Sequence, residues 1–157
     1  MVASYQAKYS EPKRELYPHT GEFMSKSFVT VSPDMDIYKA IEILLKHKIS
    51  GAAVVDENEN MVGFISEKDC LSLVAHDTYD NVLPGGKVSK YMSKGVKTLT
   101  VETGLNMVAD IFMHTPYRKL PVLDEQGKLV GMVRRRDVLS VIQELSSKQT
   151  EFMSSQH

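Results

Sequence analysis

Two short segments carry the residues whose types could recognise a charged small molecule. They read GFISEKDC over residues 63–70 and GMVRRRDV over residues 131–138, and each has an aspartate six residues after its glycine. In both, a strand is expected to end and a helix to begin. Cations in the first turn of a helix are unfavourable by roughly 0.3–1 kcal/mol each, because the helix dipole is positive there. Arg134 and Arg136 therefore indicate a bound anion, either a ligand or an acidic side chain of a partner.

The same residues also have a purely structural interpretation. A serine such as Ser66 is a common N-cap, and an aspartate in the first turn, at position 69 or 137, favours the helix dipole without any ligand. Successive helical residues point about 100° apart, so at most two of the three arginines can face one cleft, and Arg135 is expected to be solvated. The residues alone leave the binding and the structural interpretation open.

The two segments are equivalent parts of an internal repeat. Residues 24–72 align with residues 92–140 without a gap, at a constant offset of 68 (92 − 24). Identical positions include the MSK at the start of both copies and the Leu-Ser two residues after each motif aspartate. The chain is therefore a duplicated supersecondary unit. An approximate two-fold axis between the copies predicts a cleft with two equivalent pockets.

Both copies predict the element order strand, helix, strand, turn, strand, helix. In the first copy, residues 28–31 alternate like a short strand, and Ser32-Pro33-Asp34 provides the signals of a helix start. The apolar residues expected on the buried face of this helix are Ile37, Ala40, Ile41, Leu44 and Leu45. A small sheet covered by helices on one side cannot bury its other side alone. The two halves are therefore expected to pack sheet to sheet.

The repeat divides the chain into five parts. They are an N-terminal arm over residues 1–22, a first repeat over 23–75, a linker over 76–90, a second repeat over 91–147 and a flexible tail over 148–157. The arm is expected to pack on the body or on a partner. In the second repeat, helices are expected over roughly 102–114 and 135–147.

Composition and charge restrict the classes of function. The chain has 157 residues, of which 42% are hydrophobic and 25% charged, as is usual for a soluble globular domain. Its net charge of −1 provides no general basic surface for nucleic acid or an anionic membrane. No apolar run approaches the length of a membrane span, about 20 residues, or looks like a secretory signal, so a cytoplasmic location is expected.

The element order and the paired motifs resemble the cystathionine β-synthase (CBS) domain, present here as a tandem pair. The features that carry the resemblance are apolar-apolar-Asp before each turn and Gly-apolar-apolar-x-x-x-Asp after it, within roughly residues 23–146. The resemblance implies an α/β fold in which two β-α-β-β-α repeats, related by a pseudo-two-fold axis, pack their sheets face to face. It also implies a regulatory Bateman module that binds an adenosine-containing ligand between the repeats.

The resemblance assigns residues to each of the two pockets. Asp69 is expected to accept hydrogen bonds from ribose hydroxyls and Ser66 to face the phosphate, whereas Arg134 stands where the family usually has Thr or Ser. The residues expected in pocket 1 are Ser50, Phe64, Ser66, Lys68, Asp69 and Tyr117. The residues expected in pocket 2 are Val29, Ile49, Arg118, Lys119, Met132, Arg134, Arg136 and Asp137.

The two pockets are expected to differ in charge. Four cations are expected beside Asp137, namely Arg118, Lys119, Arg134 and Arg136. Pocket 1 has one cation at the matching positions, Lys68. Pocket 2 is therefore expected to take the more highly charged phosphate chain, with the adenine against Val29, Ile49 and Met132.

No pattern in the sequence predicts catalysis or a metal site. The chain contains none of the short motifs of zinc proteases, P-loop proteins or α/β-hydrolases. Residues 56–67 have acidic and amide residues at some positions of a calcium loop, but Met61 stands where that loop requires glycine. The sequence therefore predicts a non-enzymatic module without a metal.

The resemblance also sets the expected ligand and partners. The ligand is expected to be AMP, ADP or ATP, with S-adenosylmethionine ranked after them, and no cofactor is required. A homodimer and an unidentified effector protein are the expected partners, without a membrane. The alternative is a ligand-free dimerisation or scaffold module whose basic cleft receives an acidic segment. Nucleic-acid binding through the arginine run is a weaker third option.

Overall fold

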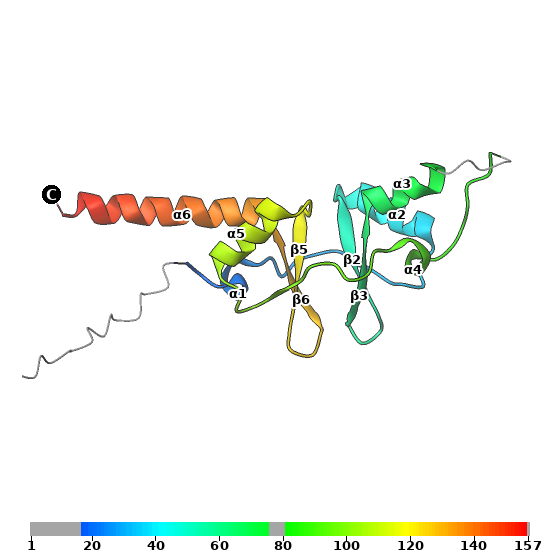
Figure 1. Ribbon diagram of the computed structural model, residues 1–157, viewed down its shortest axis with the longest axis horizontal. Helices are drawn as coiled ribbons and strands as arrows, with labels where there is room; N and C mark the ends of the chain where they lie inside the picture. Colours follow the sequence, from blue (N-terminus) through cyan, green and yellow to red (C-terminus); the bar gives the residue numbers. More distant parts are fainter. Residues whose placement is uncertain (1–16, 76–80, 157) are drawn as a thin grey trace, which may run out of the picture.

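The computed structural model describes residues 17–75 and 81–156, which form two similar halves around two small sheets (Figure 1). In each sheet the first two strands are parallel and the last two are antiparallel. The first sheet consists of β1 (Thr30–Val31), β2 (Gly51–Val55) and β3 (Met61–Ser66). The second sheet consists of β4 (Leu99–Thr100), β5 (Lys119–Leu123) and β6 (Leu129–Arg134).

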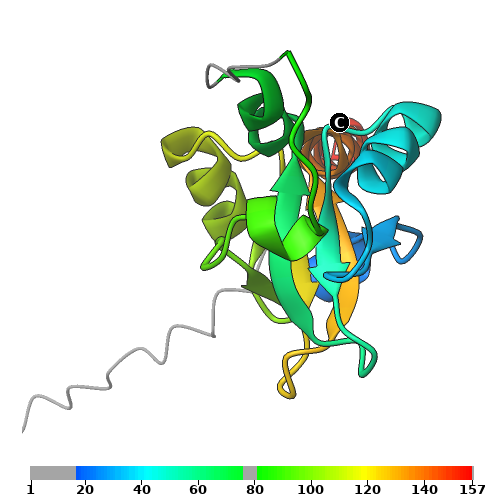
Figure 2. The ribbon, with the colours of Figure 1, turned by 90° about the vertical axis from the view of Figure 1, so that its right-hand side faces the viewer.

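Four longer helices accompany the sheets and two short ones precede them. The longer helices are α2 (Ile37–His47), α3 (Glu67–Ala75), α5 (Leu105–His114) and α6 (Arg135–Ser154). The short helices are α1 (Thr20–Phe23) and α4 (Val88–Tyr91). Figures 1 and 2 show the longer helices at one edge of the molecule and the hairpin turns of both sheets at the opposite edge. The α/β fold of two β-α-β-β-α repeats is therefore confirmed, with a one-turn helix added before each repeat.

The short helix α1 packs on the second half, although it precedes the first. The backbone N–H of Thr20 donates to Thr103 O and that of Gly21 to Val101 O, both at 2.8 Å. Ser25 and Met132 of β6 exchange two backbone hydrogen bonds of 2.9 and 3.0 Å. The end of the segment that we placed in the N-terminal arm, residues 20–22, and the start of the first repeat thus complete the second half. Residues 1–16 of the arm lie outside the described residues.

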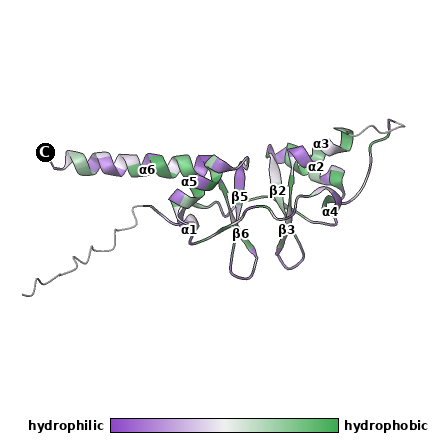
Figure 3. Cartoon of the chain, viewed as in Figure 1, coloured by the Kyte–Doolittle hydropathy of each residue, from purple (hydrophilic) through white to green (hydrophobic). Residues whose placement is uncertain are grey.

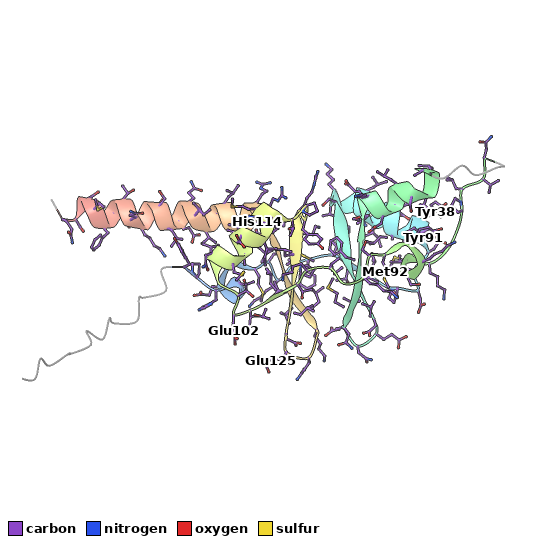
Figure 4. All side chains as sticks on the ribbon, in the orientation of Figure 1. Tyr38, Tyr91, Met92, Glu102, His114 and Glu125 are labelled. Atoms are coloured by element: carbon purple, nitrogen blue, oxygen red, sulfur yellow. The ribbon has the colours of Figure 1, made fainter. Side chains whose placement is uncertain are left out.

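The short helix α4 makes the reciprocal contacts with the first half. The backbone N–H of Val88 donates to Met35 O at 2.8 Å, and Phe64 and Ser93 exchange two backbone hydrogen bonds of 2.9 and 2.8 Å. Figure 4 shows Tyr91 and Met92 beside β3. Each half is therefore closed by a segment exchanged with the other half.

Each half has an apolar core that includes residues of its exchanged segment. In the first half, Val88 is fully buried together with Ile37 and Ile65, and Met92 packs against them. In the second half, Phe23 and Met24 pack against the buried residues of the second sheet and its helices. Two glycines make this possible, because a Cβ at Gly63 would overlap Met92 Sδ and a Cβ at Gly131 would overlap Met24 Sδ.

Helix α2 begins later than expected, and of the five residues expected on its buried face three are buried, Ile41 is partly buried against the core and Leu45 is exposed. Its N-cap is Asp36, whose carboxylate accepts the Tyr38 backbone N–H at 2.9 Å, whereas Ser32 belongs to the preceding turn. Leu45 is 74% exposed, while Leu44 is buried. One residue corresponds to a rotation of about 100° around the helix, which moves Leu45 away from the sheet.

Helix α6 extends beyond the expected end at residue 147. It continues to Ser154, so most of the segment expected as a tail over residues 148–157 is helical. Hydroxyls in this segment donate to carbonyls four residues earlier, as Ser154 does to Thr150 O at 2.8 Å. Figure 3 shows that the C-terminal end of α6 projects away from the sheets and mixes polar and apolar residues. No helix within residues 17–75 and 81–156 is long and apolar enough to cross a membrane.

Candidate functional site

A cavity of about 740 Å³ lies between the two halves. Its walls are formed by the end of β3 and the start of α3, by α4 and the chain after it, and by residues 116–119 at the start of β5. The first half, its exchanged segment and the second half therefore all contribute. This volume is within the range of about 300–1,000 Å³ that is usual for small-molecule sites.

Asp69 is the central acceptor of the cavity. Its Oδ2 accepts the Ser66 backbone N–H and the Ser66 hydroxyl, both at 2.9 Å, and its own N–H donates to Ser66 Oγ at 3.1 Å. These bonds form the reciprocal cap of α3 and fix the orientation of the carboxylate. Its Oδ1 accepts the Ser93 hydroxyl at 3.0 Å. A ligand hydroxyl can replace that of Ser93 without disturbing the cap.

The charged side chains of the cavity have a positive excess. The cations are Lys68, Lys90, Arg118 and Lys119, against the carboxylates of Glu67 and Asp69. Lys119 is half-buried, and its Nζ donates to Gly51 O of the first half at 2.6 Å. Burial lowers the pKa of Lys119, the nearby charge of Arg134 lowers it further, and Glu67 acts in the opposite direction. The excess of cations favours an anionic ligand.

The remaining wall of the cavity is aromatic and apolar. It includes Phe64, Tyr91, Val96 and Tyr117. Tyr91 is fixed by a hydrogen bond from its hydroxyl to Gly85 O at 2.7 Å, and Lys90 Nζ lies 5.4 Å from the centre of its ring. Planar rings with apolar faces can stack on such side chains. The cavity thus combines an apolar wall, a fixed carboxylate and several cations.

All six residues that the sequence assigned to pocket 1 line this cavity. Arg118 and Lys119, which were assigned to pocket 2, line it as well. Sequence reasoning missed Lys90, Tyr91 and Ser93, because it did not foresee that their segment packs on the first half. The repeat alignment shows that this segment is equivalent to residues 22–25, but it does not show which sheet either segment joins.

The residues assigned to pocket 2 are arranged differently from the expectation. Arg134 pairs with Asp137: Nη2 donates to Oδ1 at 3.0 Å, Nε to Oδ2 at 3.3 Å, and the backbone N–H to Oδ2 at 2.7 Å. These contacts with Asp137 raise the pKa of Arg134. Arg136 is exposed. Because Arg118 and Lys119 line the Asp69 cavity and Arg134 is paired, the four cations are not gathered as free charges beside Asp137.

The apolar residues assigned to pocket 2 serve mainly in packing. Met132 is 4% exposed, and its backbone is paired with Ser25. Ile49 packs against the core of the first half, and Val29 is partly buried next to β1. In the parts of the chain that the structure describes, no three His, Cys, Asp or Glu side chains converge to hold a metal ion.

Comparison with known proteins assigns the family. The sequence model of the CBS domain matches residues 21–76 and 88–144, so the chain belongs to the CBS domain family and contains two such domains in tandem. This confirms the resemblance that the repeated motifs indicated.

Related sequences include a CBS domain-containing protein and an enzyme. The CBS domain-containing protein CBSX1 of Arabidopsis thaliana is 30% identical over 156 residues, which cover 83% of this chain and 66% of that protein. Inosine-5'-monophosphate dehydrogenase of Aquifex aeolicus is 32% identical over 113 residues, which cover 71% of this chain but 22% of the enzyme. The chain therefore spans about two thirds of the first relative and less than a quarter of the second.

Two solved structures with nucleotides are similar to this chain. The structure of CBSX2 of Arabidopsis thaliana in complex with AMP has 28% sequence identity and a TM-score of 0.72, covering 82% of this chain and 98% of that chain. The cytosolic domain of the Mg²⁺ channel MgtE in complex with ATP also has 28% identity, with a TM-score of 0.66, and covers 79% of this chain and 48% of that chain.

Proposed function

We propose that this CBS pair is a regulatory module that binds AMP, ADP or ATP in the cavity beside Asp69. The observation that carries the proposal is the composition of this cavity, which places a fixed carboxylate between an aromatic wall and four cations. The AMP and ATP complexes of CBSX2 and MgtE support the same ligand class.

The geometry of the cavity suggests an orientation for the nucleotide. Two ribose hydroxyls donate to Asp69 Oδ1, one of them in the place of the Ser93 hydroxyl, because a carboxylate oxygen can accept more than one donor. The adenine ring then packs against Phe64, Tyr91 or Tyr117. The phosphate extends toward Arg118 and Lys119, and guanidinium groups bind phosphate through charge-assisted hydrogen bonds.

This orientation explains how occupancy is transmitted. Asp69 belongs to the first half, whereas Arg118 and Lys119 belong to the second. A ligand that contacts both favours the arrangement of the halves in which these groups converge, to the extent of its differential affinity. The changed arrangement is then sensed by an effector protein or by a second copy in a homodimer, and both act in the cytoplasm.

Thermal unfolding with a panel of ligands tests the proposed function. A ligand at 100 times its dissociation constant adds about 2.7 kcal/mol to the free energy of unfolding, which raises the Tm of a chain of this size by roughly 5–10 °C. We expect this rise with AMP, ADP or ATP, a smaller rise with S-adenosylmethionine, and none with CMP or single-stranded DNA. The absence of any rise with adenosine compounds at millimolar concentration would leave the ligand-free scaffold as the better function.

The position of the phosphate can be tested at Arg118. We expect Arg118→Ala to weaken ATP binding about 5-fold, because one exposed ion pair contributes up to about 1 kcal/mol. Adenosine binding should be unchanged, since it has no phosphate. Arg136→Ala removes an exposed arginine outside the cavity and is the matched control. Isothermal titration calorimetry of both variants measures the affinities, and equal losses for ATP and adenosine would refute the assignment.

A further inference from the structure

The two halves treat their motif aspartates differently. In the first half, the residue three positions before Asp69 is Ser66, whose small side chain caps the helix and leaves Oδ1 to the Ser93 hydroxyl. In the second half, the residue three positions before Asp137 is Arg134, whose guanidinium contacts both carboxylate oxygens. The Asp137 side chain is consequently only 16% exposed, while the Arg134 side chain is 57% exposed.

A second difference concerns the hydroxyl that stands opposite the aspartate. Ser25 is equivalent to Ser93 by the 68-residue offset. The Ser25 hydroxyl donates to Ser27 O at 2.9 Å, whereas the Ser93 hydroxyl donates to Asp69. Arg134 thus supplies to Asp137 the donors that Ser66 and Ser93 supply to Asp69.

Three of the four cations of the Asp69 cavity also lack a cationic equivalent in the other repeat. The positions that correspond to Lys90, Arg118 and Lys119 are occupied by Glu22, Ser50 and Gly51. A phosphate that entered the second half of the cleft would therefore meet neutral or acidic residues at three of the four equivalent positions. The two repeats therefore have the same fold, but the charged residues at their equivalent sites differ.

We propose that Arg134 is a built-in occupant of the second ribose site, so that the chain binds one nucleotide, beside Asp69, and none beside Asp137. This inference rests on the proposed function, since it concerns the equivalent site of the same ligand. To bind Asp137, a ribose would have to break a two-pronged, charge-assisted pair and replace it with hydrogen bonds from neutral hydroxyls. Both kinds of bond end on the Asp137 carboxylate. A hydroxyl brings no positive charge, whereas the guanidinium brings one and holds both oxygens in a bidentate geometry, so this exchange is unfavourable.

The proposal also explains the first of the three arginines, Arg134, which is the last residue of β6. Arg134 gains no stabilisation from the helix dipole, but Asp137 lies one turn along the same helix and provides the anion. The pair holds the start of α6 as the Ser66–Asp69 pair holds the start of α3. The substitution therefore keeps the structural role of the motif and removes its ligand-binding role.

The number of nucleotides bound per chain tests this inference. Equilibrium dialysis with radiolabelled AMP up to millimolar concentration should give one AMP per chain for the wild type. Arg134→Ser introduces the residue that the first repeat has at this position, and this variant should bind two AMP per chain. Arg134→Ala, which frees Asp137 without adding a hydroxyl, should also show a second, weaker binding event. Arg135→Ser is the control, because it changes the neighbouring exposed arginine, and this variant should still bind one AMP per chain.

The double variant Asp69→Ala/Arg134→Ser identifies the new site, because it should bind one AMP beside Asp137. Two AMP per wild-type chain, or one AMP per Arg134→Ser and Arg134→Ala chain, would overturn the inference while the proposed function stands. If the wild type binds none and Arg134→Ser binds one, the Asp69 site is refuted and the role of Arg134 is supported. If none of these proteins binds AMP, both proposals are wrong.

Discussion

Replacing Asp69 with alanine is expected to abolish the rise in Tm that AMP produces. In the proposed complex the carboxylate accepts ribose hydroxyls, and a hydrogen bond to a charged group contributes roughly 1.5–3 kcal/mol. The loss of two such bonds lowers affinity by about 100-fold or more, which brings the remaining binding below detection in a thermal shift experiment. The affinity itself is measured by isothermal titration calorimetry.

The same substitution also removes a structural interaction, which has to be separated from binding. Asp69 accepts two hydrogen bonds from Ser66 at the start of α3, so the unliganded variant should unfold about 1 kcal/mol more easily. Asp137→Ala is the matched control, because it removes the equivalent helix-start interaction with Arg134. It should lower the Tm by a similar amount and keep the AMP-dependent rise. An Asp69→Ala protein that retains the wild-type rise would contradict the assignment of the site.

The fold could be predicted because the sequence signals for each element occur in both copies of the repeat. Every apolar run, turn and motif glycine occurs in two copies at one offset, and the strands β2 and β5 begin at positions that differ by that offset. The exchange of α1 and α4 could not be predicted for the same reason. Met24 and Met92 are equivalent residues of the repeat, and each covers a motif glycine, Gly131 or Gly63. Because both segments carry the same methionine and both sheets the same glycine, the local pattern does not tell which sheet each segment joins.

The residues that line the cavity could be predicted in part, and the differences between their expected and observed positions have a geometric cause. Asp69 and its neighbours follow directly from the motif, which places them at one strand end. Lys119 was expected beside Asp137 but lines the Asp69 cavity, because it lies where the two halves meet, with its Nζ on Gly51 O of the other half. Arg134 was taken as a ligand for phosphate because the sequence shows a cation at a helix start. Its partner, Asp137, was in the same motif, but the resemblance had already assigned that aspartate to ribose.

Replacing Ile65 with alanine is expected to lower the free energy of unfolding by about 2–5 kcal/mol. Ile65 is fully buried in β3, where it pairs with Ala52 of β2 and packs in the core of the first half. Truncation removes its apolar contacts and leaves a cavity that the close-packed surroundings fill only in part. Because Phe64 and Ser66, the two residues beside it, line the proposed site, the effect on binding can be measured in the same protein.

Chemical denaturation with and without AMP separates the two effects. Leu71→Ala is the control, since Leu71 is 63% exposed on α3, and its truncation should change stability by less than about 0.5 kcal/mol. If the strand remains in place, AMP at a fixed multiple of its dissociation constant adds the same increment to both variants, because this increment depends only on occupancy of the folded state. If Ile65→Ala lowers the free energy of unfolding no more than Leu71→Ala does, the packing of the first sheet does not support the cavity.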